Sequence, residues 1–286
     1  MLLPPLAAEK MFTIGGLPIT NSYINSTLAL VIFVILAFVV NSAIRKFYPQ
    51  NKAPKGFLNF FESILELLIG YFDGVTKNRK KTLKFLPIVG SLFFFILISN
   101  WMGLLPGTGS IGIYQLHEGH TALIPLLRPA NTDLNMTIAL AVVTVVGSHI
   151  LGIFTIGFFK YLNKFVKIGD IILALKSMNP IKILTAVIEF FVGILETISE
   201  FAKILSLSLR LFGNIFAGEV LLTVIAGLIA YLAPLPFMAL EILVGAVQAV
   251  VFSMLALVYL TMAAEEPHGA HAEHEHSAHV PATTHP

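Results

Sequence analysis

The feature that most limits how this chain can fold is a series of long stretches with almost no charge. The stretches 23–44 and 86–105 are each about as long as the ~20 residues that a helix needs to cross the hydrocarbon core of a bilayer. A third covers 134–159, and two more lie within 181–264. Only 12% of the 286 residues are charged, against about a quarter in a soluble domain. We therefore predict an all-α, polytopic membrane protein with about five membrane helices.

The segments between these spans are polar or amphipathic. Residues 57–72 (FLNFFESILELLIGYF) place Glu62 and Glu66 on one face and apolar side chains on another, which predicts an amphipathic helix at the membrane surface. An ordinary packed helix is an equally good interpretation. The predicted organisation is an external segment 1–22, a first membrane helix 23–44, a linker 45–85 with the amphipathic helix, a helix pair 86–159 with an external loop 106–133, a second linker 160–180, a helical hairpin 181–264 and a disordered His-rich tail 265–286.

The distribution of basic residues predicts the orientation. The linker 45–84 contains nine lysines and arginines, whereas the loop 106–133 contains only Arg128. Because cytoplasmic loops carry the excess of Lys and Arg, both linkers and the C-terminus are expected in the cytoplasm and the N-terminus outside. The absence of cysteine excludes disulfides and thiolate metal sites.

The segment 181–231 contains no proline and has helical periodicity throughout. A helix of this length extends about 75 Å, more than twice the ~30 Å hydrocarbon core. It must therefore tilt strongly or break, with Gly213 and Gly218 as the expected bending points. A turn with Pro234 and Pro236 leads into a last helix at 237–264, so we predict a long, strongly tilted C-terminal hairpin.

Polar residues form one stripe along this long helix when each residue is turned by 100°. The stripe contains Glu196, Ser199, Glu200, Lys203, Ser206, Arg210 and Asn214. A polar helix face at the membrane surface does not explain Arg210. Its side chain stays charged, and placing that charge near mid-membrane costs between about 2.5 and more than 10 kcal/mol. Glu219 lies nine residues further, about 180° away on the helix. Arg210 is therefore expected to find its carboxylate partner on another subunit.

Two carboxyls are predicted near the external end of the hairpin. Glu219 points toward the rest of the chain, where Glu241 and Gln248 share one face of the last helix. The polar outer loop adds Asp133 and Asn135, and together these residues favour a hydrated path that passes protons. The alternative is a static pair of glutamates that share one proton.

Several motifs resemble one known family. SLSLRLFGNIFAGE (206–219), QAVVFSMLALVYLTMA (248–263) and PANTDLNMTIAL (129–140) resemble subunit a of the membrane sector of F-type ATP synthase, and the resemblance covers about 20–264. It implies a stator channel beside a rotating ring of c subunits, with a b-subunit peripheral stalk, other ATP synthase subunits and the lipid bilayer as further partners.

The resemblance also implies roles for individual residues. Arg210 is expected to face the carboxyls of the ring and to prevent a direct proton leak, with Asn214 and Gln248 close to it. The expected half-channels are an external one with Glu219, Glu241, Asp133 and Asn135, and a cytoplasmic one with Glu196, Ser199, Glu200 and Ser206. The position of Glu241 is often histidine in the family, so two adjacent glutamates are a departure. One of them is expected to hold a proton, and the sequence does not say which.

Other functions remain open at this point. A secondary ion transporter also carries buried charges at mid-membrane, but the two halves of this chain do not repeat one another. A structural membrane anchor leaves Arg210 unexplained, and a Na⁺-translocating version of the same subunit remains possible. The chain lacks a G-x-x-x-x-G-K-[ST] loop, so we expect a non-catalytic subunit with no cofactor, no metal site and no nucleic-acid partner. The expected location is a bacterial inner membrane, with an organellar membrane as the alternative.

Overall fold

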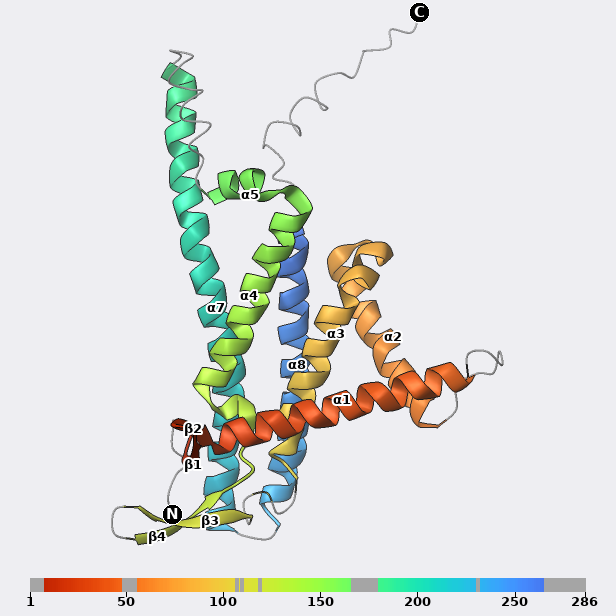
Figure 1. The fold of residues 1–286 in the computed structure, drawn as a ribbon, viewed down its shortest axis with the longest axis vertical. Coiled ribbons are helices and arrows are strands. Elements are labelled where there is room, and N and C mark those ends of the chain that lie inside the picture. The colour runs from red at the N-terminus through yellow and green to blue at the C-terminus, as the bar shows by residue number, and fades with distance from the viewer. Residues whose placement is uncertain are drawn as a thin grey trace, which may run out of the picture.

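The computed structural model describes residues 8–47, 56–105, 108, 111–117, 120–165, 180–229 and 232–264. Figure 1 shows an elongated arrangement of helices with two small β-hairpins at one end. In chain order, the elements are β1 (Lys10–Ile14), β2 (Leu17–Thr20), α1 (Asn21–Phe47), α2 (Phe57–Thr76), α3 (Arg79–Met102), β3 (Gly112–His117), β4 (His120–Pro125), the 3₁₀ turn η2 (Ala130–Thr132), α4 (Leu134–Ile156), α5 (Phe158–Phe165), α7 (Pro180–Leu228) and α8 (Pro234–Ala264).

Five of these helices are long and apolar enough to cross a membrane: α1, α3, α4, α7 and α8. This confirms the prediction of an all-α, polytopic membrane protein. Helix α2 buries Leu58, Leu68 and Phe72 and packs against α3 and α8, while Glu62 and Glu66 are exposed. The helix is therefore amphipathic, as predicted.

The two β-hairpins were not predicted. Strands β1 and β2 pair antiparallel, and so do β3 and β4 within the segment 106–133. The turn between β1 and β2 is Gly15–Gly16, and both residues have positive φ, 58° and 87°. Glycine is the residue that adopts such a two-residue hairpin turn without steric cost. The glycine pair was thus a sequence feature that indicates a β-hairpin at this position.

Helix α7 is a single uninterrupted helix of 49 residues, equivalent to about 75 Å. The helix continues through Gly213 and Gly218, the expected bending points. It therefore does not break, which was one of the two outcomes expected for this segment. Figure 1 shows α7 following the long axis of the molecule, with α8 returning in the opposite direction and α1 crossing these helices at a wide angle. Helix α8 begins at Pro234, three residues before the predicted start, because proline fits the first turn of a helix.

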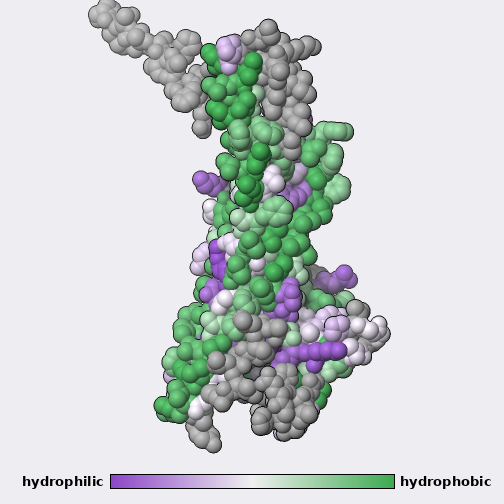
Figure 2. All heavy atoms as spheres, turned by 90° about the vertical axis from the view of Figure 1, so that its left-hand side faces the viewer, coloured by the Kyte–Doolittle hydropathy of each residue, from purple (hydrophilic) through white to green (hydrophobic). Residues whose placement is uncertain are grey.

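The core lies where α3, α4, α7 and α8 meet. Helix α7 contributes Leu207, Leu211 and Ile215 to it, and α8 contributes Phe252 and Leu257. The outer faces carry many exposed apolar side chains, and the view of the molecule in Figure 2 is predominantly apolar along its length. Such a surface suits contact with lipid.

Parts of the predicted organisation cannot be compared with the structure. The tail 265–286 and most of the linker 160–180 lie outside the described residues, as do residues 1–7 and 48–55. The described end of the linker, 160–165, belongs to α5.

Candidate functional site

Helix α7 has one face in the core and one face that the described chain leaves uncovered. Leu207 and Leu211 are each 1% exposed and point into the core. Ser206, Arg210 and Asn214 lie on the other side of the helix and are exposed, as the 100° turn per residue requires. Ser199, two turns before Ser206, is also exposed. The polar stripe predicted from the sequence thus points outward.

Arg210 has no carboxylate partner among the residues that the structure describes. Its Nη2 atom donates a hydrogen bond to Ser206 Oγ at 3.3 Å, one turn earlier on α7. A neutral hydroxyl does not balance a guanidinium charge, so the charge of Arg210 is available to a group outside the described chain.

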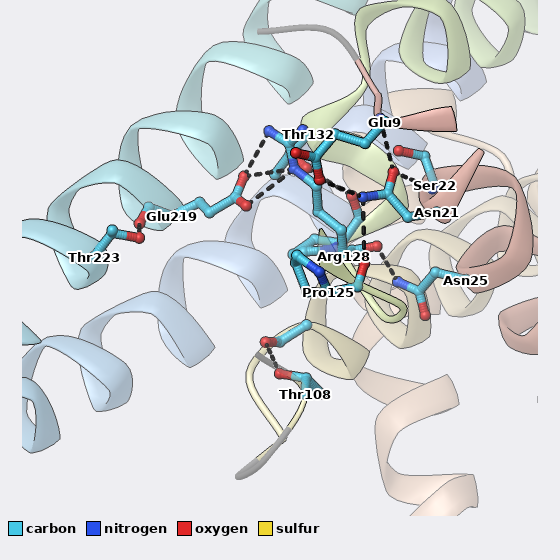
Figure 3. Close-up of polar contacts among 12 residues, drawn as sticks. Glu9, Asn21, Ser22, Asn25, Thr108, Pro125, Arg128, Thr132, Glu219 and Thr223 are labelled. Atoms are coloured by element: carbon cyan, nitrogen blue, oxygen red, sulfur yellow. Dashed lines mark hydrogen bonds and ion pairs between the residues drawn. The ribbon is translucent and has the colours of Figure 1, made fainter. Parts of the chain in front are cut away.

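Glu219 lies on the opposite side of α7 and forms an ion pair with Arg128 (Figure 3). Arg128 Nε lies 3.0 Å from Oε1 and 3.2 Å from Oε2 of Glu219, and Nη2 lies 3.0 Å from Oε2. Both carboxylate oxygens are therefore engaged by one guanidinium. The side chain of Arg128 is 2% exposed and that of Glu219 is 19% exposed, so the pair is largely shielded from solvent.

The start of α1 holds the loop that carries Arg128. Asn25 Nδ2 donates to the backbone oxygen of Arg128 at 2.7 Å, and Asn21 Nδ2 donates to the backbone oxygen of Pro125 at 3.4 Å (Figure 3). Both asparagines are fully buried. Arg128 was noted from the sequence only as a charge of the external loop. Its status as the sole basic residue of that loop was the available signal.

Glu241 of α8 approaches α7 at Gly218, the residue before Glu219. Its carboxyl group on α8 contacts the backbone of Gly218 on α7, and a side chain at position 218 would overlap it. Glu241 is 8% exposed, and its Oε1 atom has no hydrogen-bond partner among the described residues. Gly218 therefore permits a close approach of the Glu241 carboxyl on α8 to the backbone of α7.

Further buried amides extend from this point. Asn100 Nδ2 donates to Gly245 O at 3.0 Å, and Asn131 Nδ2 donates to Asn100 Oδ1 at 2.7 Å. Within the described chain, Asn131 Oδ1, Asn25 Oδ1 and Ser99 Oγ are buried without a partner. Buried polar atoms that protein groups leave unpaired are the usual sites of internal water, so this end of the bundle is suited to hydration.

The other two residues predicted for the external path have different surroundings. Asp133 is 8% exposed, and its carboxylate accepts a hydrogen bond from Asn135 N at 3.0 Å, which caps the N-terminus of α4. The side chain of Asn135 is exposed. Asp133 thus has a structural task in addition to any part in a path.

Near the opposite end of α7, Glu200 is the centre of a polar cluster. Lys203 Nζ lies 2.7 Å from Glu200 Oε1, and His149 Nε2 on α4 lies 3.5 Å from Oε2. His149 Nδ1 lies 2.7 Å from the hydroxyl of Tyr161 on α5. Lys203 also lies over the ring of Tyr259 at 5.3 Å. The sequence alone did not indicate these contacts, because the partners of His149 come from α5 and α7.

Burial raises the pKa of the Tyr161 hydroxyl to about 12, and the nearby carboxylates of Glu200 and Glu196 act in the same direction. The phenol therefore keeps its proton at neutral pH and can donate it to His149 Nδ1. With Nδ1 as the acceptor of this hydrogen bond, the ring N–H is on Nε2, which faces Glu200. A cavity of about 410 Å³ adjoins these groups between α4, α5 and α7.

The remaining predicted residues have fewer contacts. Glu196 and Gln248 are partly buried, on α7 and α8 respectively. In the described part of the chain, no group of three or more His, Asp or Glu side chains could hold a metal ion. The site consists of fixed cations, carboxyls and neutral polar groups arranged along helices. Such a site can bind and pass ions.

Fold and site together define a multi-pass helical membrane protein with ionisable side chains inside its spans. The family model of the ATP synthase A chain matches residues 23–261. The ATP synthase subunit a of Mycobacterium ulcerans (strain Agy99) is 32% identical over 249 residues, which cover 86% of this chain and 87% of that protein. The subunit a of Mycobacterium marinum is 32% identical over the same shares. The chain belongs to the ATP synthase A chain family and is an ion-translocating subunit of the membrane sector.

Proposed function

We propose that this subunit provides two offset half-channels that carry protons to and from the carboxyl sites of a rotating ring of c subunits. Arg210 is the fixed cation that faces those carboxyls. The observation that carries the proposal is the position of Arg210 on the uncovered face of α7, with no carboxylate partner among the described residues. A guanidinium so placed attracts each arriving carboxylate and blocks a direct passage of protons between the half-channels.

The positions along α7 support two separate paths. Glu196 precedes Arg210 by 14 residues and Glu219 follows it by nine, which corresponds to about 21 Å and about 14 Å along the helix. Arg210 therefore lies between the two sets of polar groups. The external half-channel contains Glu219, Glu241, Asp133 and Asn135. The cytoplasmic half-channel contains Glu196, Ser199, Glu200 and Ser206, and Asn214 and Gln248 lie near the arginine.

The proposed setting follows from the same assignment. The subunit contacts the c ring, a b-subunit peripheral stalk and lipid in a bacterial inner membrane, with its N-terminus outside and its C-terminus in the cytoplasm. It performs no phosphoryl chemistry, since the sequence has no phosphate-binding loop of the common type.

The test is the substitution Arg210→Ala in the assembled complex in membrane vesicles. We expect ATP-driven proton pumping to be lost while subunit a still co-purifies with the ring. Leu209→Ala, an exposed neighbour on the same helix, serves as the matched control and should retain pumping. Pumping by Arg210→Ala at the rate of the control contradicts the proposal. Repeating the assay with Na⁺ uptake measured in place of proton uptake identifies the transported ion.

A further inference from the structure

We propose that Arg128 is a positioning residue that holds Glu219 as a fixed anion, so that Glu241 is the carboxyl that takes up and releases the proton on the external side. The inference rests on the proposed function and assigns different tasks to two residues that the sequence leaves equivalent.

The geometry around Glu219 does not suit a proton carrier. Arg128 contacts both of its carboxylate oxygens within 3.2 Å. A carboxyl that takes up a proton must turn a donor toward one of its neighbours, and a guanidinium has only donors and accepts nothing. Protonation of Glu219 would also remove the negative charge that contacts the guanidinium of Arg128, whose side chain is 2% exposed. The carboxylate of Glu219 is therefore committed to its contact with Arg128.

Arg128 itself is fixed from the other side. Asn25 binds its backbone oxygen at 2.7 Å, and Asn21 binds Pro125 in the preceding strand. Both side chains come from the first turns of α1 and are fully buried. The guanidinium consequently has a defined position on the external side of α7, which a flexible surface arginine does not have.

The contacts of the Glu241 carboxyl differ from those of the Glu219 carboxyl. Its carboxyl contacts the backbone of Gly218, and its Oε1 atom has no hydrogen-bond partner among the described residues. On α7, Gly218 is followed by Glu219, whose carboxylate forms an ion pair with Arg128 of the loop before η2. On α3, the neighbouring side chains are the neutral Asn100 and Trp101, which bond Gly245 O and Ile242 O. A protonated carboxyl is the form that this site accommodates, and its free oxygen is open to a water or a passing donor.

Glu219 therefore supplies a fixed negative charge, and Glu241 carries the proton that is exchanged. The neutral pair of Arg128 and Glu219 spares Glu241 the repulsion of an uncompensated neighbouring carboxylate. It also keeps Glu241 free of a direct salt bridge, so that its proton can leave. Glu241 then exchanges protons between the hydrated external end and the groups nearer Arg210.

The test compares three variants in vesicles that contain the whole membrane sector. Glu241→Gln should lower passive proton conduction by about 100-fold. Glu219→Gln removes the carboxylate that binds the buried guanidinium of Arg128, so conduction or assembly should fail. The double variant Arg128→Gln/Glu219→Gln removes both charges together and should conduct at least about tenfold better than Glu219→Gln alone. Co-purification of subunit a with the ring measures assembly in each case.

An infrared readout separates positioning from a purely structural effect. The carbonyl band of a protonated carboxyl shifts in D₂O, and the band assigned by difference to subunit a should vanish in Glu241→Gln and persist in the double variant. An assembled double variant that does not conduct, or a Glu241→Gln variant that conducts like the wild type, overturns the proposal.

The same vesicles distinguish this proposal from the proposed function. Retained pumping by Arg210→Ala refutes the proposed function as a whole. A variant Arg210→Ala that cannot pump, together with a Glu241→Gln variant that conducts normally, refutes only the assignment of the proton to Glu241.

Discussion

The close contact between Gly218 and the Glu241 carboxyl allows a sharp test by adding one methyl group. In Gly218→Ala, the new Cβ would overlap the carboxyl carbon and both oxygens of Glu241. Carbon and oxygen atoms need a separation of about 3.3 Å, so the carboxyl has to move by more than about 1 Å. The backbone of α7 is held by its own hydrogen bonds, and the end of a glutamate side chain is the part that yields.

The magnitude has two opposing parts. Alanine in place of glycine within a helix stabilises it by about 0.5–1 kcal/mol. Forcing Glu241 from its side-chain conformation costs about 0.5–1.5 kcal/mol. These nearly cancel, so the complex should assemble normally. A displacement of about 1 Å in a reacting group can cost up to about 100-fold in rate, and we expect proton conduction to fall by about 10- to 100-fold.

The assay is passive proton flow through vesicles stripped of the catalytic sector and driven by a potassium diffusion potential. Gly147→Ala on α4 is the matched control, because a methyl group there meets no atom within 4 Å and brings the same gain in helix stability. If Gly218→Ala conducts as well as Gly147→Ala, then the position of the Glu241 carboxyl does not limit proton flow and the reasoning fails.

Three further predictions concern packing, capping and the cytoplasmic cluster. Gly152→Ala places a methyl group 2.7 Å from the backbone oxygen of Ala263 and against the ring of Tyr161; we expect a loss of about 1–3 kcal/mol, seen as a lower unfolding temperature of the purified subunit. Asp133→Ala should cost about 1 kcal/mol through loss of the α4 cap, and Asp133→Ser should restore the stability. Because the proposed external half-channel contains the Asp133 carboxylate, proton flow should stay reduced in Asp133→Ser, and normal flow would contradict that assignment. Tyr161→Phe removes the hydrogen bond to His149. Because burial raises the pKa of Tyr161 to about 12, its effect on proton pumping should be the same at pH 6 and pH 9, and a change confined to the alkaline side would contradict the assigned donor.

The arrangement of α7 could be predicted because it depends on periodicity alone. Arg210 and Glu219 are nine residues apart on one helix, and a turn of 100° per residue places them on opposite sides. The structure agrees: Arg210 is exposed, and Glu219 binds a residue of the chain itself. Glu200 and Lys203 are three residues apart on the same stripe, where side chains are neighbours, and they pair at 2.7 Å.

The partners of these residues could not be predicted, since they come from distant parts of the chain. Arg128 and Glu219 are 91 residues apart, and His149 meets Glu200 from another helix. One sequence contains no information on which loop folds over which helix. The hairpin predicted that Glu219 and Glu241 lie on neighbouring helices, but the sequence could not show that Glu219 binds Arg128.

The uncovered face of α7 also has a consequence for biogenesis. A newly inserted chain that has not met its ring exposes the guanidinium of Arg210 to lipid, at a cost between about 2.5 and more than 10 kcal/mol. No carboxylate of the described chain relieves that cost. We therefore expect the free subunit to be short-lived in the membrane and to accumulate only after rings are present. The residue that serves proton transfer in the finished motor would then also set the order in which the motor is built.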